Sequence, residues 1–407
     1  MKKSFITLAI SLITVIYASA QTDLEAVLSQ FHADSLKKTV EDLVAFDNRF
    51  CSPEAGDNKK VAQYLVQRLK DYGIENAEID SFRVTMEHFI LGDIDRYMYN
   101  VKGRLGGSEK PDSIAIIGAH LDAIAYFAAK LQNTVPGAND NATGVAVMIE
   151  IARIFHANHL VPKYGIDFMA YDAEEIGLYG SKYDAQKRKN ANENIYVMLN
   201  NDMVGVQSEQ ENEWKTVFHS DADIAKDIQD KAEYLCFKYT LLLPYFPDNT
   251  TDFSYKNSDS WAYREIGFKT FYSHSYEDDP YYHTISDLPQ RLNYNYMAEI
   301  SKLHFSLLYD FAIEDITKGV NVYEHSLASA FSLYPNPTGN VLRIAAYPQN
   351  TAISRISIYD YMGREVLKNE NINSYPYNID VSGLESGLYV VKIVHSNGLQ
   401  VKRFVKQ

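Results

Sequence analysis

Apolar residues along the first three quarters of the chain follow two alternating patterns. Helical spacing occurs at residues 58–72, and Gly73 follows where a helix C-cap would stand. The run Ile-Ala-Ile-Ile at residues 114–117 is typical of a strand buried on both faces. By these criteria we expect helices at residues 24–45, 58–72, 143–157, 180–189, 221–237 and 294–313, and strands at 77–84, 98–105, 114–117, 166–171, 196–199 and 268–272. This alternation predicts an α/β fold, a three-layer αβα sandwich around a mixed, largely parallel sheet.

The pattern changes after residue 317. Residues 318–332 have the character of a linker, and residues 333–407 contain short runs of alternating apolar and polar positions separated by turn residues. Such runs without a helical period predict a small C-terminal β-sandwich. We therefore expect a main domain at residues 21–317, followed by the linker and the sandwich.

The first twenty residues have the layout of a secretory signal peptide. Lys2 and Lys3 precede an apolar run at residues 5–17, and Ala18-Ser19-Ala20 supplies the small residues before a cleavage site. A membrane anchor is the alternative, but the run is shorter than the roughly 20 apolar residues that span a bilayer. No later segment is apolar enough to cross a membrane. We expect cleavage after Ala20 and a soluble protein outside the cytoplasm.

Charge is divided unevenly along the chain. The formal net charge is −14, and residues 330–407, with 8 Lys or Arg and 5 Asp or Glu, contribute +3, which leaves −17 on residues 1–329. An acidic body argues against nucleic acid or an anionic membrane as a partner. Solubility of a secreted protein is sufficient to explain the sign.

Only two cysteines are present, Cys51 and Cys236. They cannot form a disulfide scaffold, and neither belongs to a C-x-x-C metal or redox motif. One long-range disulfide in an oxidising compartment and two separate buried thiols are both consistent with the sequence.

Metal-binding residue types occur just beyond the predicted strands and in two of the loops. Two histidines and three carboxylates suit a pair of divalent ions, zinc above all. A sixth residue, Glu174, could accept a proton from water beside such ions. Open α/β sheets bind ligands at the carboxyl ends of their strands. The five candidate ligands, in chain order, are His120, Asp140, Glu175, Asp202 and His283.

Each of these positions alone has a structural explanation. A histidine after a buried strand is commonly a core residue, although Asp122, two residues beyond His120, could orient its imidazole. Asp140 lies in a Pro-Gly-Ala-Asn-Asp-Asn turn, where aspartate is a common turn or cap residue. Adjacent acids such as Glu174 and Glu175 usually mark a solvated loop. The order and the strand-end placement of the whole set favour a metal centre.

Five stretches resemble the signature segments of one enzyme family. GAHLD, PGANDNATG, DAEEIGLYGS, NNDMVG and YYHT are similar to those of the bacterial leucyl aminopeptidase and aminopeptidase Y family of di-zinc exopeptidases, and the resemblance covers residues 35–315. It implies a phosphorylase/hydrolase-like αβα sandwich that binds two zinc ions. It also implies that Asp140 bridges the ions, with His120 and Asp202 completing one site and Glu175 and His283 the other.

The same resemblance implies roles for further residues. Glu174 would be the general base and acid, and Asp122 the partner of the His120 imidazole. The peptide bond between Asp140 and Asn141 would be cis. Tyr255 matches a tyrosine that some members place over the oxyanion. Many relatives have Ser-Asp-His where this chain has Ser-Asp-Ser at residues 258–260, but that histidine is not one of the five ligands.

The tail resembles a second family. YPNPTGN, IYDYMGREV, IDVSGLESGLYVVKI and the basic end KRFVKQ are similar to the C-terminal sorting domain of type IX secretion in Bacteroidota. This implies the type IX secretion machinery as a partner. It also implies export through the periplasm to the outer cell surface or the medium. An ordinary adhesive β-sandwich is the alternative.

The sequence therefore predicts a secreted zinc aminopeptidase that acts on peptides. Two alternatives stay open. The first is a glutaminyl cyclase on the same fold with one working zinc, which gives no reason to keep both His120 and Asp140. The second is a binding protein that lost catalysis, which should have lost ligands. A carboxypeptidase would need a basic pocket, and no cluster of Arg and Lys flanks the motifs. The preferred N-terminal residue is not determined, although Tyr245-Phe246, Phe271-Tyr272 and Met203 are candidate pocket walls.

Overall fold

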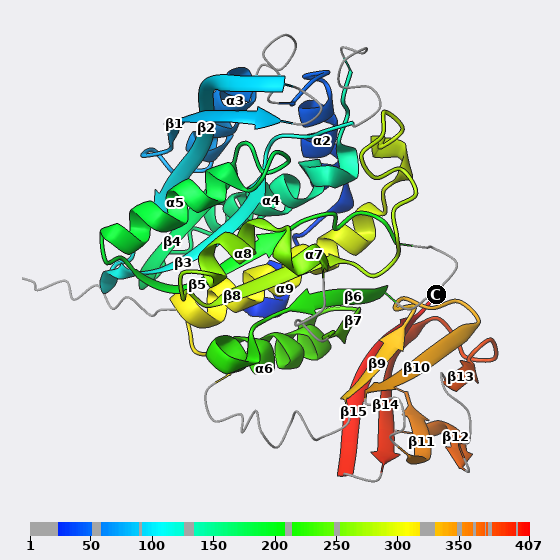
Figure 1. Cartoon of the computed structure of the whole chain (residues 1–407). Helices are drawn as coiled ribbons and strands as arrows, with labels where there is room; N and C mark the ends of the chain where they lie inside the picture. The colour runs from blue at the N-terminus through cyan, green and yellow to red at the C-terminus, as the bar shows by residue number, and fades with distance from the viewer. Residues whose placement is uncertain are drawn as a thin grey trace, which may run out of the picture.

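The computed structural model contains an αβα sandwich and a β-sandwich (Figure 1). It describes residues 23–50, 58–88, 92–125, 134–207, 214–247, 253–317, 330–347, 352–360, 364–370, 372, 377–395 and 398–407. The strands of the larger sheet are β1 (Glu78–His88), β2 (Gly92–Leu105), β3 (Lys110–His120), β4 (Tyr164–Tyr171), β5 (Asn194–Asn201), β6 (Trp214–His219), β7 (Leu242–Tyr245) and β8 (Thr270–Ser275). The helices are α1 (Leu24–Leu28), α2 (Ala33–Val44), α3 (Asn58–Asp71), α4 (Thr143–Ala157), α5 (Tyr179–Asn190), α6 (Ala222–Tyr239), α7 (Phe253–Lys256), α8 (Asp259–Arg264) and α9 (Tyr294–Ala312), with a π-helical turn η1 (Ala138–Ala142) and a 3-10 turn η2 (Pro289–Arg291).

The large sheet is parallel at its centre and has antiparallel strands on both sides. Its order is β1-β2-β4-β3-β5-β8-β6-β7. Strands β4, β3, β5 and β8 are mutually parallel, whereas β1 and β2 form an antiparallel hairpin on one side and β6 runs antiparallel to β8 on the other. The prediction of a mixed, largely parallel sheet is therefore confirmed. The carboxyl ends of the four central strands meet at one edge, which is where such sheets bind ligands.

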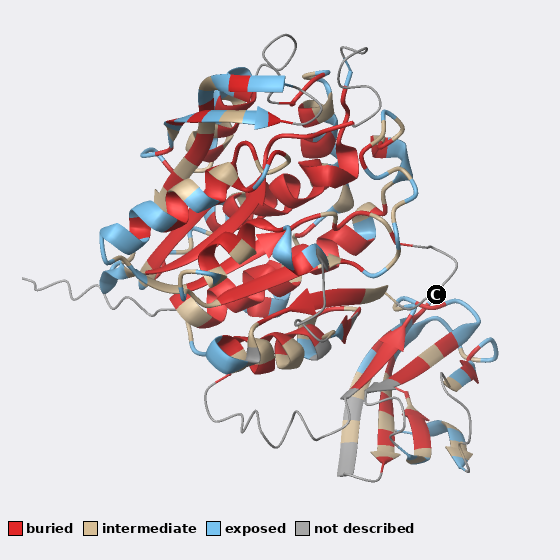
Figure 2. Cartoon of the chain, viewed as in Figure 1, coloured by how far each residue is buried: buried red, intermediate tan, exposed pale blue. Residues whose placement is uncertain are grey.

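The central strands and one helix form the most deeply buried part of the molecule. Residues Ile114–Ile117 of β3 are at most 1% exposed, and α4 is buried on nearly every face (Figure 2). A helix that is apolar all round belongs in a core. Helices α2, α3, α4, α6 and α9 pack with the apolar cluster on one face of the sheet, and α5 and α8 cover the other. The three expected layers are present.

Most expected elements occur with boundaries shifted by a few residues. The exception at the N-terminus is the helix expected at residues 24–45, which is two helices, α1 and α2. The chain turns between them, and Phe31 becomes buried against Phe305 of α9 with ring centroids 5.4 Å apart. Burial of this ring gives a reason for the break, since one continuous helix could not place it there. The pattern also missed the short elements β6, β7, α7 and α8.

The C-terminal residues form two antiparallel sheets around a core of their own. The strands are β9 (Ala330–Tyr334), β10 (Val341–Tyr347), β11 (Ile353–Tyr359), β12 (Glu365–Glu370), β13 (Tyr377–Asp380), β14 (Gly387–His395) and β15 (Gly398–Lys406), in the orders β13-β10-β9 and β12-β11-β14-β15. Side chains such as Phe331, Ile356 and Phe404 fill the space between the sheets. The β-sandwich is confirmed, and its first strand includes the last three residues of the expected linker.

Several expectations fall outside the described residues. The signal peptide, residues 318–329 of the linker and Cys51 all lie there. Cys236 is buried in α6, with its Sγ 3.6 Å from the Leu242 carbonyl oxygen. Within the ranges that are described, no helix combines the length and the apolar character needed to cross a membrane.

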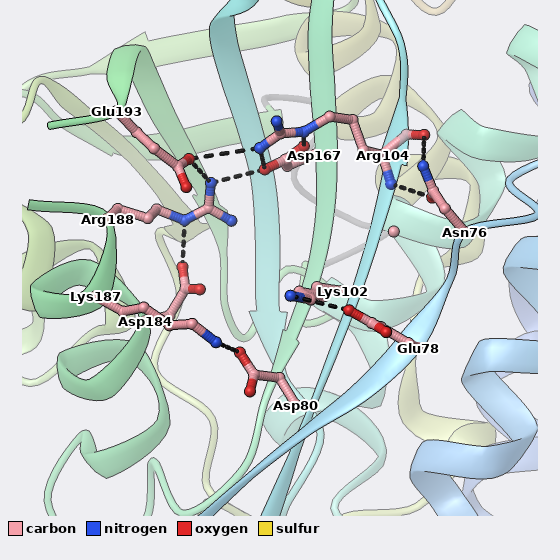
Figure 3. Close-up of a pocket in the computed structure, with 11 residues that line it drawn as sticks. Asn76, Glu78, Asp80, Lys102, Arg104, Asp167, Asp184, Lys187, Arg188 and Glu193 are labelled. Atoms are coloured by element: carbon pink, nitrogen blue, oxygen red, sulfur yellow. Dashed lines mark hydrogen bonds and ion pairs between the residues drawn. The ribbon is translucent and has the colours of Figure 1, made fainter. Parts of the chain in front are cut away.

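A buried ion network joins α5 to the sheet beside a cavity of about 290 Å³ (Figure 3). The Arg188 guanidinium donates to Asp184 at 2.5 Å, to Asp167 at 2.7 Å and to Glu193 at 2.9 Å. Arg104 forms a two-pronged contact with Asp167. Every member has a charged partner, so we interpret the network as structural. Removing one partner from such a buried pair typically destabilises a protein by about 3–5 kcal/mol.

Burial of His304 should make the folding stability of the protein depend on pH. It lies fully buried in α9, and its Nε2 shares a hydrogen bond of 2.8 Å with the Ser273 hydroxyl. Burial lowers the pKa of His304 to about 3, against about 6.5 in an unfolded chain. The neutral form is therefore favoured by folding, and the stabilisation it gives is present above pH 6.5 and lost as the pH falls toward 3.

We expect the His304→Gln variant to show a weaker pH dependence of stability than the wild type. The difference in slope between about pH 6 and pH 4 should approach 1.4 kcal/mol per pH unit, the value for one proton. Urea unfolding of both proteins across this range measures it. Identical slopes would show that His304 does not bind a proton on unfolding.

Candidate metal centre

The candidate ligands meet at the carboxyl edge of the central sheet because parallel strands end there together. His120 is the last residue of β3, Glu175 lies four residues beyond the end of β4, and Asp202 directly follows β5. Asp140 comes from η1, which enters α4, and His283 comes from the loop after β8. The Asp140–Asn141 peptide bond is cis, as the family resemblance implies. Five segments far apart in the sequence thus supply one cluster.

Asp140 stands at the centre of the cluster and presents one oxygen to each half. Its Oδ1 is 3.1 Å from His120 Nε2, and its Oδ2 is 3.1 Å from His283 Nε2. Asp202 Oδ1 lies 3.3 Å from His120 Nε2, and Glu175 Oε2 lies 3.0 Å from His283 Nε2. The side chains therefore form two groups, each of one histidine and one further carboxylate, that share Asp140.

Glu174 lies beside the first of these groups. One of its carboxylate oxygens is within 4.8 Å of ligand atoms of both His120 and Asp202, and the same limit holds among His120, Asp140 and Glu175. Glu174 is half-buried, which leaves it accessible from the cavity described below. A carboxylate at this place can reach a molecule held between the two groups.

The donor atoms fit divalent cations. Glu175 Oε1 is buried and accepts no hydrogen bond from the described residues. An orphaned buried carboxylate oxygen is costly unless a cation or a donor meets it. Imidazole nitrogens and carboxylate oxygens are ligands that zinc accepts, and three donors per ion leave open positions, as in catalytic zinc sites.

The pKa shifts of the clustered residues also favour a bound cation. Burial, reinforced by the charge of Asp140 and opposed by that of His283, raises the pKa of Glu175 to about 7. Burial also raises the pKa of Glu174 far above its ordinary value; the charge of His120 opposes this and that of Glu175 adds to it. Burial lowers the pKa of His120, but the carboxylates around it raise that pKa well above 6.5. The cluster thus holds more negative charge than its two imidazoles can offset, and cations would relieve it.

Asp122 supports the cluster from behind. It is fully buried and accepts hydrogen bonds from the backbone N–H groups of Glu174 at 3.1 Å and Glu175 at 3.2 Å. Its carboxylate is also 3.6 Å from His120 Nδ1, which lies 3.2 Å from the Asp122 carbonyl oxygen. The position suits the partner expected for the His120 imidazole, and Asp122 additionally fixes the loop that carries both glutamates.

Tyr255 is the one expected site residue that is not brought to the cluster. It is 1% exposed, its hydroxyl shares a hydrogen bond of 2.8 Å with Thr270 Oγ1, and its ring stacks on His219. It does not belong to the lining of the cavity over the cluster. The oxyanion role of Tyr255 stays a prediction from resemblance, which this placement does not favour.

A cavity of about 410 Å³ opens over the cluster. Met203 and Tyr272 line it, as two of the candidate wall residues, whereas Phe271 lies in the hydrophobic core. Its lining also includes the acidic residues Glu277 and Asp278. No lysine or arginine is among the described residues that line it.

Sequence patterns did not reveal two residues that hold the cluster. Arg49 is 1% exposed, and its guanidinium binds three backbone carbonyl oxygens next to the ligands. Asp287 accepts the backbone N–H groups of Asn139 and Asp140. Asp287 lies four residues after His283, which could have drawn attention to it, but Arg49 lies in no recognisable motif.

Comparison with known proteins identifies the family of the chain. Residues 100–308 match the model of Peptidase family M28. The chain belongs to this family. Residues 332–407 match the model of the secretion system C-terminal sorting domain, which confirms the second resemblance.

The M28 chain is similar to curated fungal proteins. A probable zinc metalloprotease of Pyrenophora tritici-repentis is 35% identical over 194 residues, which are 45% of this chain and 44% of that protein. The match therefore spans less than half the length of that relative. A probable leucine aminopeptidase of Arthroderma otae is 24% identical over 71% of this chain and 75% of its own.

Solved structures share the fold. LapB from Legionella pneumophila superposes with a TM-score of 0.59 at 24% identity, covering 72% of this chain and 76% of its own. Glutaminyl cyclase from Bacteroides thetaiotaomicron superposes with a TM-score of 0.53 at 22% identity, covering 69% and 98%. Both confirm the αβα sandwich, and the family is one of zinc-dependent metallopeptidases.

Gly137, at the start of η1, tests how tightly the turn of Asp140 is packed. Its φ is +51°, and an added Cβ would lie 2.3 Å from the Ala123 Cβ and 2.4 Å from the Asp140 carbonyl oxygen. Gly267 is a matched control, since its φ is +93° and an added Cβ would meet nothing within 4 Å.

We expect Gly267→Ala to cost about 1–2 kcal/mol, from the backbone conformation alone. Gly137→Ala should cost about 3–5 kcal/mol, because the clash is added to the same backbone term. Denaturant unfolding of both variants measures the difference. Equal losses in the two variants would contradict tight packing of this turn.

Proposed function

We propose that this protein is a secreted zinc-dependent aminopeptidase that binds two zinc ions and removes N-terminal residues from peptides. The observation that carries the proposal is the position of Asp140, whose two carboxylate oxygens face two separate pairs of side chains. A single metal would need only one of these pairs. His120, Asp140 and Asp202 would hold one ion, and Asp140, Glu175 and His283 would hold the other.

When bound, zinc ions at these residues would supply Lewis acidity toward the scissile carbonyl and toward water. The chain supplies the proton transfer. Glu174 accepts a proton from the attacking water as its oxygen bonds to the carbonyl carbon. The same carboxyl then gives that proton to the peptide nitrogen as the C–N bond breaks, so one group serves as base and acid.

The cavity supports an amino-terminal over a carboxy-terminal substrate. A free ammonium group is a cation, and Glu277 and Asp278 add acidic side chains to the lining of the cavity. A carboxypeptidase needs a cation to bind the terminal carboxylate, and the described lining has none. Met203 and Tyr272 give the cavity an apolar side that suits a hydrophobic N-terminal residue.

The tail supports a place of action outside the cell. Its match to the secretion system C-terminal sorting domain makes the type IX machinery the partner in export. The N-terminal signal peptide brings the chain to the periplasm first, and the final location is the outer cell surface or the medium. Peptides are then the substrates, and nucleic acid and membrane insertion play no part.

Glutaminyl cyclase is the second candidate, because a cyclase shares the fold. Its chemistry moves an amine onto a side-chain amide and uses one zinc with a carboxyl acid, which Glu174 could also provide. The second half of the cluster distinguishes the two reactions. A binding homologue without catalysis is less well supported, since all five ligands and Glu174 are present.

The first experiment is zinc content and hydrolysis of aminoacyl anilides by the purified wild type and the Glu174→Gln variant. We expect two zinc ions per chain in both, and a kcat lowered about 10²–10⁴-fold in the variant, the usual contribution of a general base. Glu109→Gln, an exposed carboxylate in the turn before β3, is the control and should match the wild type.

Three outcomes would overturn parts of the proposal. One zinc per chain with cyclisation of N-terminal glutamine would indicate the cyclase. An active Glu174→Gln variant with both ions bound would remove Glu174 from the mechanism. Absence of bound metal after reconstitution with zinc would exclude the enzymatic proposal.

A further inference from the structure

Arg49 joins two of the segments that carry candidate ligands. Its Nε donates to the Leu121 carbonyl oxygen at 3.0 Å, in the segment directly after His120. Its Nη1 donates to Pro136 at 2.8 Å and its Nη2 to Gly137 at 2.6 Å, in the turn that leads to Asp140. One rigid planar group therefore spans the two segments.

Backbone hydrogen bonds also join the segment around Arg49 to these two loops. The Ala123 N–H donates to the Arg49 carbonyl oxygen at 3.3 Å, and the Val135 N–H donates to the Asp47 carbonyl oxygen at 2.6 Å. The segment after α2 thus touches both loops with its backbone as well as with the Arg49 side chain. The distance between these loops is set by a third piece of chain.

Asp287 holds the Asp140 turn from the opposite side. Its Oδ1 accepts the Asn139 N–H at 2.7 Å, and its Oδ2 accepts the Asp140 N–H at 3.0 Å. Its own carbonyl oxygen accepts the Ala138 N–H at 3.3 Å. A carboxylate that takes two successive N–H groups fixes the direction of the backbone between them.

We infer that Arg49 and Asp287 are positioning residues that clamp the Asp140 turn and so set the spacing of the two cation sites. The inference rests on the proposed function and goes beyond the ligands themselves. Neither residue is one of the five candidate ligands. Each acts through Asp140, whose two oxygens must stay 3.1 Å from the nitrogens of both histidines.

Arg49 differs from an arginine in a buried ion pair, because its guanidinium binds backbone carbonyl oxygens. Among the described residues, no carboxylate lies within ion-pair distance of it, and its three side-chain hydrogen bonds go to carbonyl oxygens. Burial lowers the pKa of Arg49 to about 10, and the charges of Asp287 and Asp140 oppose that shift. The side chain is therefore a cation at neutral pH, and its positive charge helps to hold nearby carboxylates in place.

Lysine cannot replace this fork. Its ammonium carries the same charge, but it is a single point and cannot reach three carbonyl oxygens in two segments at once. Arg49→Lys therefore removes the geometry and keeps the charge. Arg188→Lys is the matched control, because Arg188 is equally buried and forked but lies in the ion network of α5 (Figure 3).

The test is zinc affinity of the full-length protein, measured by competition with a chromophoric chelator and paired with kcat and KM at saturating zinc. We expect Arg49→Lys to bind zinc about 10–100-fold more weakly, the usual effect of losing a partner that orients a ligand. Its kcat should fall while KM changes little. Arg188→Lys should lose thermal stability but bind zinc within about twofold of the wild type, since it removes no contact to a ligand-bearing loop.

A second variant keeps the test decisive if Arg49→Lys does not fold. Asp287→Asn has the same size and can accept only one of the two N–H groups, so the clamp predicts the same loss of zinc affinity. Asp310→Asn is its control, because Asp310 is a buried carboxylate that accepts the Thr317 N–H elsewhere in the fold.

The outcomes separate this inference from the proposed function. Wild-type zinc affinity in a folded Arg49→Lys or Asp287→Asn variant would overturn the clamp and leave the aminopeptidase untouched. A wild type that does not bind two zinc ions would overturn the proposed function instead. An equal loss of zinc affinity in the control variants would show a general effect of instability and would also overturn the clamp.

Discussion

Crowding of buried carboxylates at one edge of a sheet is the constraint on which this structure depends. Asp122, Asp140, Glu174, Glu175 and Asp202 come together there with only two imidazoles among them. Negative charges this close repel strongly where little water is present. The surrounding backbone must therefore be held firmly enough to keep them together, and much of the neighbouring structure serves that purpose.

Three charged side chains hold the loops of the cluster by binding backbone groups. Asp122 takes the N–H groups of both glutamates, Asp287 takes those of the Asp140 turn, and Arg49 takes three carbonyl oxygens. These contacts fix the loops through their main chain, and so they position the candidate ligands that the loops carry. Because Arg49 donates only to carbonyl oxygens in these contacts, it does not compete with a cation for the oxygens of the candidate ligands.

The parts that could be predicted from the sequence are those with local patterns. The boundaries of α4 were predicted because its apolar residues recur at helical spacing, and β3 because its centre is continuously apolar. The ligands and Asp122 were found because strand-end histidines and acids lie in recognisable stretches. Arg49 left no trace, since its partners are carbonyl groups that every residue has, and they are 72 to 88 residues away. Tyr255 shows the converse: a matching motif fixed its segment but not the direction of its hydroxyl, which packing against Thr270 determines.

The apolar clusters on either side of residue 329 share no member within the described ranges. Phe331, Ile356 and their neighbours form one cluster, and the interior around α4 and the large sheet forms others. Each unit therefore has a hydrophobic core of its own. Strand β9 of the tail contacts α6 of the main domain, but neither of the two hydrophobic cores is completed by the other unit. A cell could use the tail as an address during export and discard it on arrival, and the remaining domain would keep its hydrophobic core.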